Sequence, residues 1–435
     1  MASQRSITEL ALRIQENASA VESGAKNMPG AGFSLDFGAP PMVRLSPDLE
    51  ARRVELVEMA DELKTRLLGP IGFLTHMVLP VPVLTIILST MYAYDIAAHV
   101  PINGEPITYA DLATRCGLSE DDTRRICQAA ASFRIFTEAS PDVSIRHNAI
   151  SAPFAAMKDI FGLIVEEQCA GASKYVESLR RFPNSGEPGH AALMLASRAQ
   201  AGQRPDEEIG DPSKGFFDFI ADDEARVARF RRAMGKASAS PAFSPQHFVH
   251  ALPWADVTKA PRSIVDVGGA GGEVSIALLR EYPAIESAVS LDLPEVIAGI
   301  SPPSDLTDRL TFASYNFITQ SMERKVDAYV LRHIFHDWSD KYASKILQNL
   351  VPALRKGTRV WINEVVLPDL SETHHISDQR QRSADLLMKQ GFNGKERSRK
   401  GWESLLAEAD GRYRIGTITQ PEGAQDAVIE AVFDG

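Results

Sequence analysis

The chain has 435 residues, of which 44% are hydrophobic and 24% charged, and its formal net charge at pH 7 is −11. This length allows two or three domains with hydrophobic cores, and the composition is ordinary for a globular protein. The acidic balance argues against a surface that binds polyanions, so we expect no nucleic-acid partner.

The first 45 residues are predicted to form an arm, with a polar helix followed by a loop rich in glycine and proline. Residues 1–22 are polar and charged, unlike a signal peptide. The three cysteines, Cys116, Cys127 and Cys169, have neither metal-ligand spacing nor the pattern of a disulfide framework. We therefore expect no metal centre, and a cytoplasmic protein in a reducing compartment.

One largely apolar stretch, 69–98, raises the question of a membrane span. Pro80 and Pro82 divide it, and Asp95 and His99 lie at its end. Its unbroken part is too short for a bilayer core of about 30 Å. The expected structure is a buried or interfacial helix, without a membrane span.

Residues 46–155 are predicted to be mostly helical around a small winged-helix unit. Two helices are joined by a turn in which Ser119 is the expected N-cap, and two short strands follow. The expected ranges are 107–113, 121–133, 135–138 and 143–147. Arg124 and Arg125 lie on the second helix without a basic cluster around them, so packing or dimerisation is expected in place of DNA binding.

Residues 156–250 are predicted to form a helical connector that roofs a substrate pocket, with helices at 157–169, 191–197 and 222–239. In residues 251–435, short apolar runs alternate with helical patterns. This alternation predicts a doubly wound, Rossmann-like α/β sheet that binds ligands at the carboxyl ends of its strands. The expected strands are 263–267, 287–291, 310–313, 328–331, 358–362, 413–418 and 426–432.

A glycine-rich loop follows the first of these strands. Four glycines occupy positions 268–272, and a helical pattern resumes at Val274. Glycines let the backbone pass close to a ligand, and the helix N-terminus offers free N–H groups. The second strand ends before Asp292, which is placed to hold a ribose diol. The pattern predicts a nucleotide-type cofactor site, and the alternative for the loop alone is a turn without a ligand.

Charge indicates which cofactor this site binds. A dinucleotide site favours G-x-G-x-x-G, whereas here Asp266 precedes the glycines in D-x-G-G-x-G-G. A carboxylate at that point repels phosphate and suits a cation. S-adenosylmethionine carries an ammonium, a sulfonium and a ribose but no phosphate, so it is the predicted cofactor.

The strand at 328–331 runs into a segment with catalytic side chains, Arg332-His333-Ile334-Phe335-His336-Asp337-Trp338. An imidazole at the ligand edge, with an ordinary pKa of about 6.5, can accept a proton at neutral pH. The structural alternative is a helix start capped by Asp337 or Ser339. Two later acids, Glu364 and Glu396, are either partners of this site or surface charges.

From Asp266 to Val432 the chain resembles the class I S-adenosylmethionine-dependent O-methyltransferases of the caffeate and flavonoid type, as found in fungal secondary metabolism. The matching motifs are V-D-V-G-G-x-G-G (265–272), L-D-L-P-E-V (291–296), L-R-x-I-F-H-D-W-S-D (331–340), I-N-E-x-V-L-P (362–368) and N-G-K-E-R (393–397). The resemblance extends to the N-terminal winged unit and covers about residues 46–435.

The resemblance implies that His336 is the general base, that Glu364 and Glu396 orient it, and that the N-terminal helices form a homodimer. It also implies cofactor contacts from Asp292, Arg332 and the 268–272 loop, and Trp338 is expected to pack an aromatic face against adenine. The full set of expected cofactor contacts is Asp266, Gly268, Gly269, Gly271, Asp292, Leu293, Asn316, Phe317, Arg332 and Trp338. The expected walls of the acceptor pocket are Phe230, Met234, Leu387, Met388 and Phe392, which suit a small aromatic or polyketide-type acceptor.

Two positions depart from the family pattern. Asn316 stands where the family usually has an acid near the adenine amine, although an amide carbonyl can accept the same hydrogen bond. His333 stands where methylating relatives usually have a bulky aromatic residue, and it is a further candidate catalytic residue.

Some fungal proteins of this fold use bound S-adenosylmethionine as a cation in pericyclic or dehydration reactions, and His333 with Arg332 fits such a use. A non-methylating enzyme is therefore the alternative to methyl transfer. A winged-helix regulator with a vestigial ligand domain is the alternative from another class.

Overall fold

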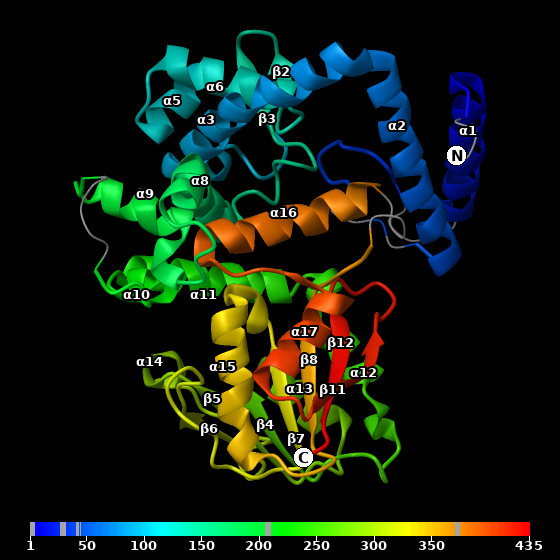
Figure 1. Cartoon of the computed structure of the whole chain (residues 1–435). Coiled ribbons are helices and arrows are strands. Elements are labelled where there is room, and N and C mark those ends of the chain that lie inside the picture. Colours follow the sequence, from blue (N-terminus) through cyan, green and yellow to red (C-terminus); the bar gives the residue numbers. More distant parts are fainter. Residues whose placement is uncertain (1–4, 27–31, 41–42, 44, 205–209, 370–374) are drawn as a thin grey trace. The chain divides into compact units, whose positions relative to one another are not determined.

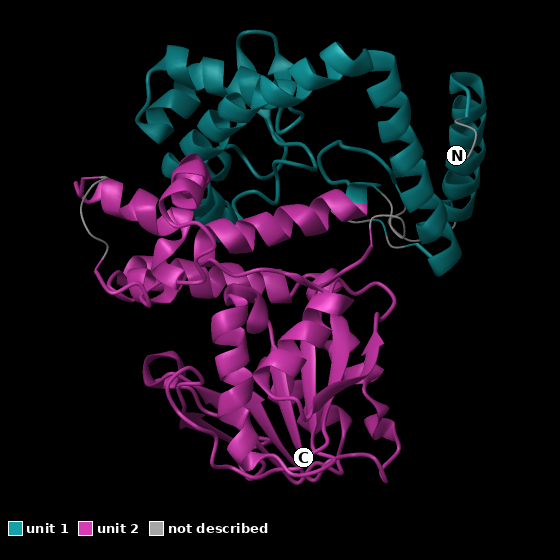
Figure 2. Ribbon diagram, viewed as in Figure 1, with its two compact units in different colours: residues 1–169, 374–376 teal, residues 170–373, 377–435 magenta. Residues whose placement is uncertain are grey.

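The computed structural model describes residues 5–26, 32–40, 43, 45–204, 210–369 and 375–435. The chain divides into two units, one of residues 1–169 with 374–376 and one of residues 170–373 with 377–435 (Figure 2). The division falls inside the segment predicted to be the helical connector.

The first unit is mainly helical. Its elements are α1 (Ile7–Ala25), α2 (Pro47–Val78), α3 (Pro80–Ala93), α4 (Ile96–His99), β1 (Ile107–Thr108), α5 (Tyr109–Cys116), α6 (Glu120–Ser132), β2 (Thr137–Ser140), β3 (Ser144–Arg146) and α7 (Lys158–Gly162), followed by a π-helical segment (Leu163–Gln168). Helix α1 begins with a capping box, because Ser6 and Glu9 each bind the other's backbone N–H.

The predicted helix, turn, helix and pair of strands are all present within residues 107–146. Ser119 caps α6 by accepting a hydrogen bond from the backbone of Asp122, as its position predicts. Strand β1 joins β3 and β2 in a three-stranded antiparallel sheet. Tyr109, Leu112 and Ile145 are fully buried in the core of this region.

The apolar stretch of α2 and α3 is largely exposed, so of the two expected structures, a buried or an interfacial helix, the buried one is wrong for this unit. Leu67 is 65% exposed, Ile71 76% and Leu79 66%. The stretch is also interrupted, because Gly69 has a φ of 65° and Pro70 follows it. A side chain that packs within its own unit would be shielded from water, so these residues point to a surface that contacts something else.

By length and composition, the stretch Pro47–Ala93 is the one candidate for a membrane span among the described helices, and only 6% of its most apolar window is buried. A single helix of this kind does not by itself indicate a span.

The second unit carries the predicted α/β sheet, with helices before it and around it (Figure 1). The helices are α8 (Cys169–Arg181), α9 (Ala192–Gln200), α10 (Phe216–Ala221), α11 (Glu224–Ser238), α12 (Pro245–Ala251), α13 (Glu273–Glu281), α14 (Pro294–Ile297), α15 (Asp340–Leu350), α16 (His375–Phe392) and α17 (Arg399–Ala409). The strands are β4 (Ser263–Val267), β5 (Ser287–Asp292), β6 (Leu310–Ser314), β7 (Ala328–Arg332), β8 (Arg359–Glu364), β9 (Val366–Leu367), β10 (Arg397–Ser398), β11 (Tyr413–Thr419) and β12 (Ala427–Phe433).

Seven of these strands form one sheet in the order β11-β12-β8-β7-β4-β5-β6. The strands β8, β7, β4, β5 and β6 run parallel, and β12 is antiparallel to both of its neighbours. The chain runs outward from β4 to β5 and β6 and then returns to β7 on the other side of β4, which places a topological switch point between β4 and β7, the usual position of a ligand crevice. The predicted doubly wound fold is confirmed.

Alternate residues along the strands supply a core on each face of the sheet. Val265, Leu331 and Ile362 pack with α15 and α17, while Ile264, Val330 and Trp361 pack with α12 and α13. Figure 1 shows α15 and α17 on the face turned to the viewer. Burial on both faces explains why these strands read in the sequence as continuous apolar runs.

Candidate active site

The glycine loop after β4 forms a tight turn over the adjacent strand. The N–H groups of Gly268 and Gly269 both donate to the carbonyl oxygen of Leu291. Gly268 and Gly272 have φ values of 72° and 78°, in the left-handed region that favours glycine. Gly271 lies between them, beside the carboxylate of Glu273. The loop thus brings backbone close to the carboxyl edge of β4 and β5, where a ligand binds.

Asp266 lies beneath this loop, and its carboxylate is 1% exposed. The hydroxyl of Ser275 donates to it at 2.9 Å. A Cβ on Gly269 would lie 2.7 Å from Cγ of Asp266, so only glycine fits above the carboxylate. Burial, together with the charges of Glu273 and Asp292, raises the pKa of Asp266 to about 6. Asp266 therefore supports the loop and adds negative charge from below it.

Asp292 lies at the end of β5 and holds the same loop. Its Oδ2 accepts from the N–H of Ala270 at 3.0 Å, and its Oδ1 accepts from the N–H of Leu293 at 2.7 Å. Burial raises the pKa of Asp292, and the nearby Glu295 adds to this effect. Each carboxylate oxygen retains acceptor capacity for a ribose hydroxyl.

These residues fit S-adenosylmethionine. Burial raises the pKa of both Asp266 and Asp292, and neighbouring acids add to the effect at each, so the site has a negative potential that a cationic ligand relieves and a phosphate would worsen. Asp292 would hold the ribose and the glycine loop would pass beneath the ligand.

Asn316 and Phe317, two predicted cofactor contacts, differ in whether their side chains already have partners in the protein. Oδ1 of Asn316 accepts hydrogen bonds from the backbone of Ile318 and Thr319, so it already caps a turn. The expectation that this carbonyl is the acceptor for the adenine amine is therefore corrected. Phe317, a predicted cofactor contact, lies edge-on to Trp338, with ring centroids 6.0 Å apart.

Arg332, a predicted cofactor contact, is engaged by the protein itself. Its Nε donates to Oδ1 of Asn363 at 2.9 Å and its Nη2 to the carbonyl of Phe243. Nη2 also lies 3.8 Å from Oδ2 of Asp426. With three protein partners, this guanidinium braces the end of β7.

The structure brings together His336, Glu364 and Glu396, the three residues that the resemblance places at the reaction centre. Nδ1 of His336 lies 3.2 Å from Oε2 of Glu364 and 3.5 Å from Oε1 of Glu396. Both carboxylates are buried, and the imidazole is 20% exposed. Glu396 is thus not the exposed turn charge that its cationic neighbours suggest.

A third carboxylate, Asp337, approaches the other ring nitrogen, with Oδ1 3.6 Å from Nε2 of His336. Burial alone would lower the pKa of His336, but the charges of Glu364, Asp337 and Glu396 outweigh it and raise this pKa well above its usual value. The pKa of Glu364 falls to about 2, because the charge of His336 outweighs burial. Burial raises the pKa of Asp337 to about 7, and that of Glu396 also rises.

This result corrects the sequence argument, which assumed an imidazole near its ordinary pKa. Without ligands the pair is an imidazolium beside an ionised carboxylate, and something must lower the pKa of His336 before it can accept a proton.

The loop that carries His336 is held from several sides. Oε1 of Glu364 accepts from the N–H groups of Ile334 and Phe335, both at 2.7 Å. Arg397 is 2% exposed and donates to the carbonyls of Phe335 and Trp338 at 2.7 and 2.8 Å. Such a two-sided clamp fixes the imidazole before any ligand arrives.

Gly394 lets a second segment approach this loop. A Cβ at that position would meet the carbonyl oxygen of His336 and lie 2.6 Å from the carbonyl carbon of Asp337. The next N–H, from Lys395, donates to the same His336 oxygen at 3.0 Å. Glycine is therefore required here, which explains the N-G-K-E-R motif.

His333 lies beside His336 at the end of β7. The two imidazole rings are nearly parallel, with an interplanar angle of 13° and centroids 5.5 Å apart. Nε2 of His333 donates to Oδ2 of Asp426 at 2.7 Å. The backbone of His333 has a φ of 53°, a conformation that costs a residue with a side chain about 1–3 kcal/mol.

An aromatic cluster lies against Trp338. It contains two of the predicted pocket residues, Phe230 and Phe392, together with Phe216 and Phe217. The other three predicted pocket residues are not part of this cluster: Met234 is exposed, and Leu387 and Met388 are half-buried on α16.

Sequence reasoning missed several residues of this site. Phe216 and Phe217 carried a signal, because adjacent aromatics before a predicted helix are a candidate pocket wall. Asp337 was considered only as a helix cap. Arg397 and Asp426 gave no local signal, since each acts on a segment far away in the sequence.

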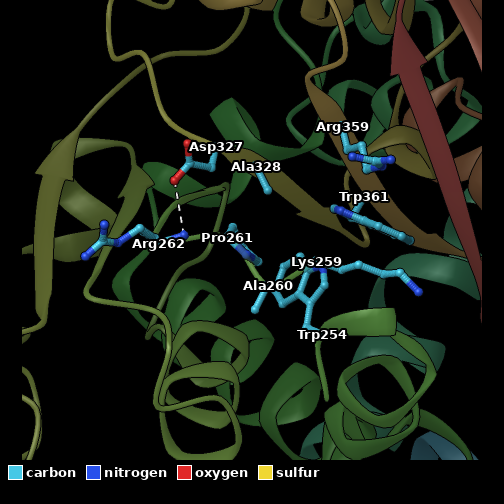
Figure 3. Close-up of a pocket in the computed structure, with 9 residues that line it drawn as sticks. All are labelled: Trp254, Lys259, Ala260, Pro261, Arg262, Asp327, Ala328, Arg359 and Trp361. Atoms are coloured by element: carbon cyan, nitrogen blue, oxygen red, sulfur yellow. Dashed lines mark hydrogen bonds between the residues drawn. The ribbon is translucent and has the colours of Figure 1, made fainter. Parts of the chain in front are cut away.

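A hollow of about 290 Å³ lies at the opposite edge of the sheet, where β4, β7 and β8 begin (Figure 3). Its charges are already paired: Lys259 with Asp256, and Arg359 with Glu430. Ligands of doubly wound sheets bind at the carboxyl ends of the strands, so this hollow is not the predicted cofactor site.

Comparison with known proteins agrees with the geometry. Residues 203–411 match the O-methyltransferase domain family. The chain is 30% identical to O-methyltransferase kk1A of Curvularia clavata over 430 residues, which cover 98% of this chain and 97% of that protein.

Two solved structures share the fold at 19% identity. The crystal structure of OxaC gives a TM-score of 0.74 and covers 98% of this chain and 100% of that chain. A structure titled "A Pericyclic Reaction enzyme" gives a TM-score of 0.70 and covers 96% and 100%. Together with the motifs and the site, the match over nearly the whole chain shows that the protein belongs to the S-adenosylmethionine-dependent O-methyltransferase family.

Proposed function

We propose that this enzyme transfers a methyl group to a hydroxyl of a small aromatic or polyketide-type secondary metabolite, with His336 as the general base. The observation that carries the proposal is the position of His336, which two buried carboxylates hold at the carboxyl edge of the sheet. The glycine loop and an aromatic cluster belong to the same edge.

When bound, S-adenosylmethionine supplies an activated methyl group on a sulfonium. The protein's task is to align the acceptor hydroxyl and remove its proton. Because Glu364 and Glu396 occupy Nδ1 of His336, Nε2 is the atom that takes the proton. A cation bound near the imidazole would lower its pKa, so Nε2 of His336 would be available as a base when the cofactor occupies the site.

The acceptor class follows from the aromatic cluster. Phe217 and Trp338 have centroids 6.4 Å apart with an interplanar angle of 29°, and Phe392 lies 5.7 Å from Phe217. Such surfaces favour flat apolar rings. Phe392 of this cluster lies two residues before Gly394, which contacts the loop that carries His336. The aromatic cluster is therefore next to the proposed base.

The test is a transfer assay with purified enzyme, methyl-labelled S-adenosylmethionine and a panel of phenols and hydroxylated polyketides. We expect labelled ether product and S-adenosylhomocysteine. His336→Ala should reduce the rate about 10²-fold or more while the affinity for S-adenosylhomocysteine, measured by calorimetry, stays nearly unchanged. Product that forms without label transfer, or full activity of the variant, would overturn the proposal.

The second candidate is a pericyclase or dehydratase that binds the cofactor without transferring methyl. The observation in its favour is His333, whose ring is fixed beside His336 by Asp426. Against it, Nε and Nη2 of Arg332 already donate to protein acceptors, so these two groups are not available to a substrate. The same assay separates the two candidates, because only methyl transfer consumes the cofactor.

We also propose a homodimer formed through the N-terminal helices. The support is the exposed apolar surface of α2 and α3, including Leu67, Ile71 and Leu79. Light scattering should give twice the chain mass for the wild type, and Ile71→Asp with Leu79→Asp should yield monomers. A monomeric wild type at micromolar concentration would rule this out.

A further inference from the structure

His333 has a backbone conformation that is uncommon for a residue with a side chain. Its φ of 53° lies in the left-handed region, which costs any residue other than glycine free energy, although histidine enters it more often than most residues do. Two contacts keep it there: its N–H donates to the carbonyl of Asn363 at 3.2 Å, and its Nε2 donates to Asp426 at 2.7 Å. Retained strain beside a reaction centre is a reason to look for function.

Asp426 is built to orient this ring. Its side chain is 5% exposed, and Oδ2 receives the imidazole N–H. The guanidinium of Arg332, 3.8 Å from the same oxygen, balances the negative charge. Oδ1 is buried and has no hydrogen-bond donor among the described residues. A carboxylate only accepts hydrogen bonds, so it fixes the proton on Nε2 of His333.

The consequence for His333 is a defined tautomer. In the neutral ring, a proton on Nε2 leaves Nδ1 as an acceptor. Nδ1 has no partner in the part of the chain that the structure describes, and the ring is 26% exposed. Since the ring lies parallel to His336 at 5.5 Å, an acceptor molecule held at one imidazole is within reach of the other.

We propose that His333 accepts a hydrogen bond from the acceptor molecule through Nδ1, and that Asp426 is the positioning residue that fixes this tautomer. The inference rests on the proposed methyl transfer and deepens it. The enzyme then selects acceptors that carry a second hydroxyl on the same ring, in addition to the one that is methylated. A site built to bind a hydroxyl rejects an analogue that lacks it, because its own polar group is left unpaired.

The tautomer can be measured without any acceptor. Nitrogen-15 NMR of the full-length enzyme, saturated with S-adenosylhomocysteine, reports which nitrogen of each imidazole carries the proton, and His333→Gln assigns the signals. We expect Nε2–H in the wild type. Asp426→Leu should reduce the Nε2–H tautomer, since no acceptor for that proton is left. Asp434→Leu is the matched control, because Asp434 is an exposed acid just after β12, and it should change nothing.

Selectivity is measured with two probes that differ by one hydroxyl, methyl 3,5-dihydroxybenzoate and methyl 3-hydroxybenzoate. The wild type should prefer the dihydroxy probe in kcat/KM by about tenfold or more. His333→Phe should bring the ratio close to one, mainly through KM. If the wild type methylates neither probe, their dissociation constants with S-adenosylhomocysteine bound are compared in the same way.

The outcomes distinguish a failure of the role assigned to His333 from a failure of the proposed methyl transfer. An Nδ1–H tautomer in the wild type, an unchanged tautomer in Asp426→Leu, or an unchanged probe ratio in His333→Phe overturns the inference. If Asp426→Leu does not fold, the wild-type tautomer and the His333→Phe ratio still decide. Absence of methyl transfer to any phenol, with the Nε2–H tautomer present, defeats the proposed function but leaves the positioning of His333 by Asp426 intact.

Discussion

Glu364 binds His336 twice, once through the imidazole and once through the backbone of the loop that carries it. Oε2 lies 3.2 Å from Nδ1 of His336, while Oε1 accepts from the two N–H groups that precede this residue. A single carboxylate therefore sets both the position and the charge of the proposed base.

Glu364→Gln should lower kcat about 10²-fold or more, because a neutral amide neither stabilises the imidazolium nor accepts both backbone hydrogen bonds equally well. The affinity for S-adenosylhomocysteine should change little. Steady-state kinetics and calorimetry check this, with Glu403→Gln on the exposed face of α17 as the control. A variant with wild-type kcat would contradict the role assigned to Glu364.

Activity should rise with pH through the raised pKa of His336, because only the free base accepts a proton. Glu396→Gln removes one of the charges that raise this pKa, so its pH–rate profile should move to lower pH.

The free energy of unfolding should change with pH in the opposite direction to the rate. The raised pKa stabilises the fold fully below the unfolded value of about 6.5, and this contribution is lost as the pH rises through the folded value. Rate profiles and urea unfolding across pH 6–10 test both statements; parallel trends would refute them.

Cofactor binding should release a proton, because a sulfonium near the imidazolium of His336 lowers its pKa. S-adenosylhomocysteine lacks the charge on sulfur and provides the matched control, so it should release fewer protons. Calorimetry in two buffers of different ionisation enthalpy gives the number released. Equal values for both ligands, or a difference that persists in His336→Gln, would show that the sulfonium does not act on this residue.

Gly394→Ala should damage the site, because its methyl group would collide with the backbone at His336 and Asp337. We expect a loss of about 1–3 kcal/mol in the free energy of unfolding and a large fall in kcat. Gly411→Ala is the control, since a Cβ there meets nothing within 4 Å. If both variants behave alike in urea unfolding and kinetics, the close approach is not important.

Chelators should leave the activity unchanged. The His336, Glu364 and Glu396 ligand atoms lie within 4.8 Å of one another, close enough for a divalent cation. In the proposed mechanism, however, Nδ1 needs its proton to pair with the carboxylates. Added Zn²⁺ should therefore inhibit, and EDTA should reverse that inhibition. Loss of activity in EDTA, restored by Zn²⁺, would instead establish a metal enzyme.

The sheet could be predicted closely from the sequence, and the reason is burial. Strand β4 occupies the predicted residues, and β5, β6 and β7 each extend one residue beyond the prediction, because apolar runs bounded by turn residues mark strands covered on both faces. The carboxyl-edge rule then placed the glycine loop, His336 and Glu364 together. The apolar surface of α2 and α3 could not be assigned, because periodicity does not distinguish a buried face from an exposed one.

The part of the site that escaped prediction depends on contacts between distant segments. Asp426 lies 93 residues after His333, and Arg397 lies 62 residues after the Phe335 carbonyl that it binds. Nothing in the local sequence marks either residue, since an acid before a strand and an arginine in a charged turn are ordinary at a surface. The raised pKa of His336 likewise required the three-dimensional position of three carboxylates.

The reversed direction of β12 determines at which edge of the sheet a label can be attached without approaching His336. Ala427 pairs with Glu364 and Val432 with Arg359, so this strand begins near the chemistry and leaves the sheet at the far edge. A fluorophore or an affinity handle attached at Asp434, just beyond β12, would therefore lie at the edge of the sheet opposite His336. Attachment there would leave the edge that carries His336 open to small molecules.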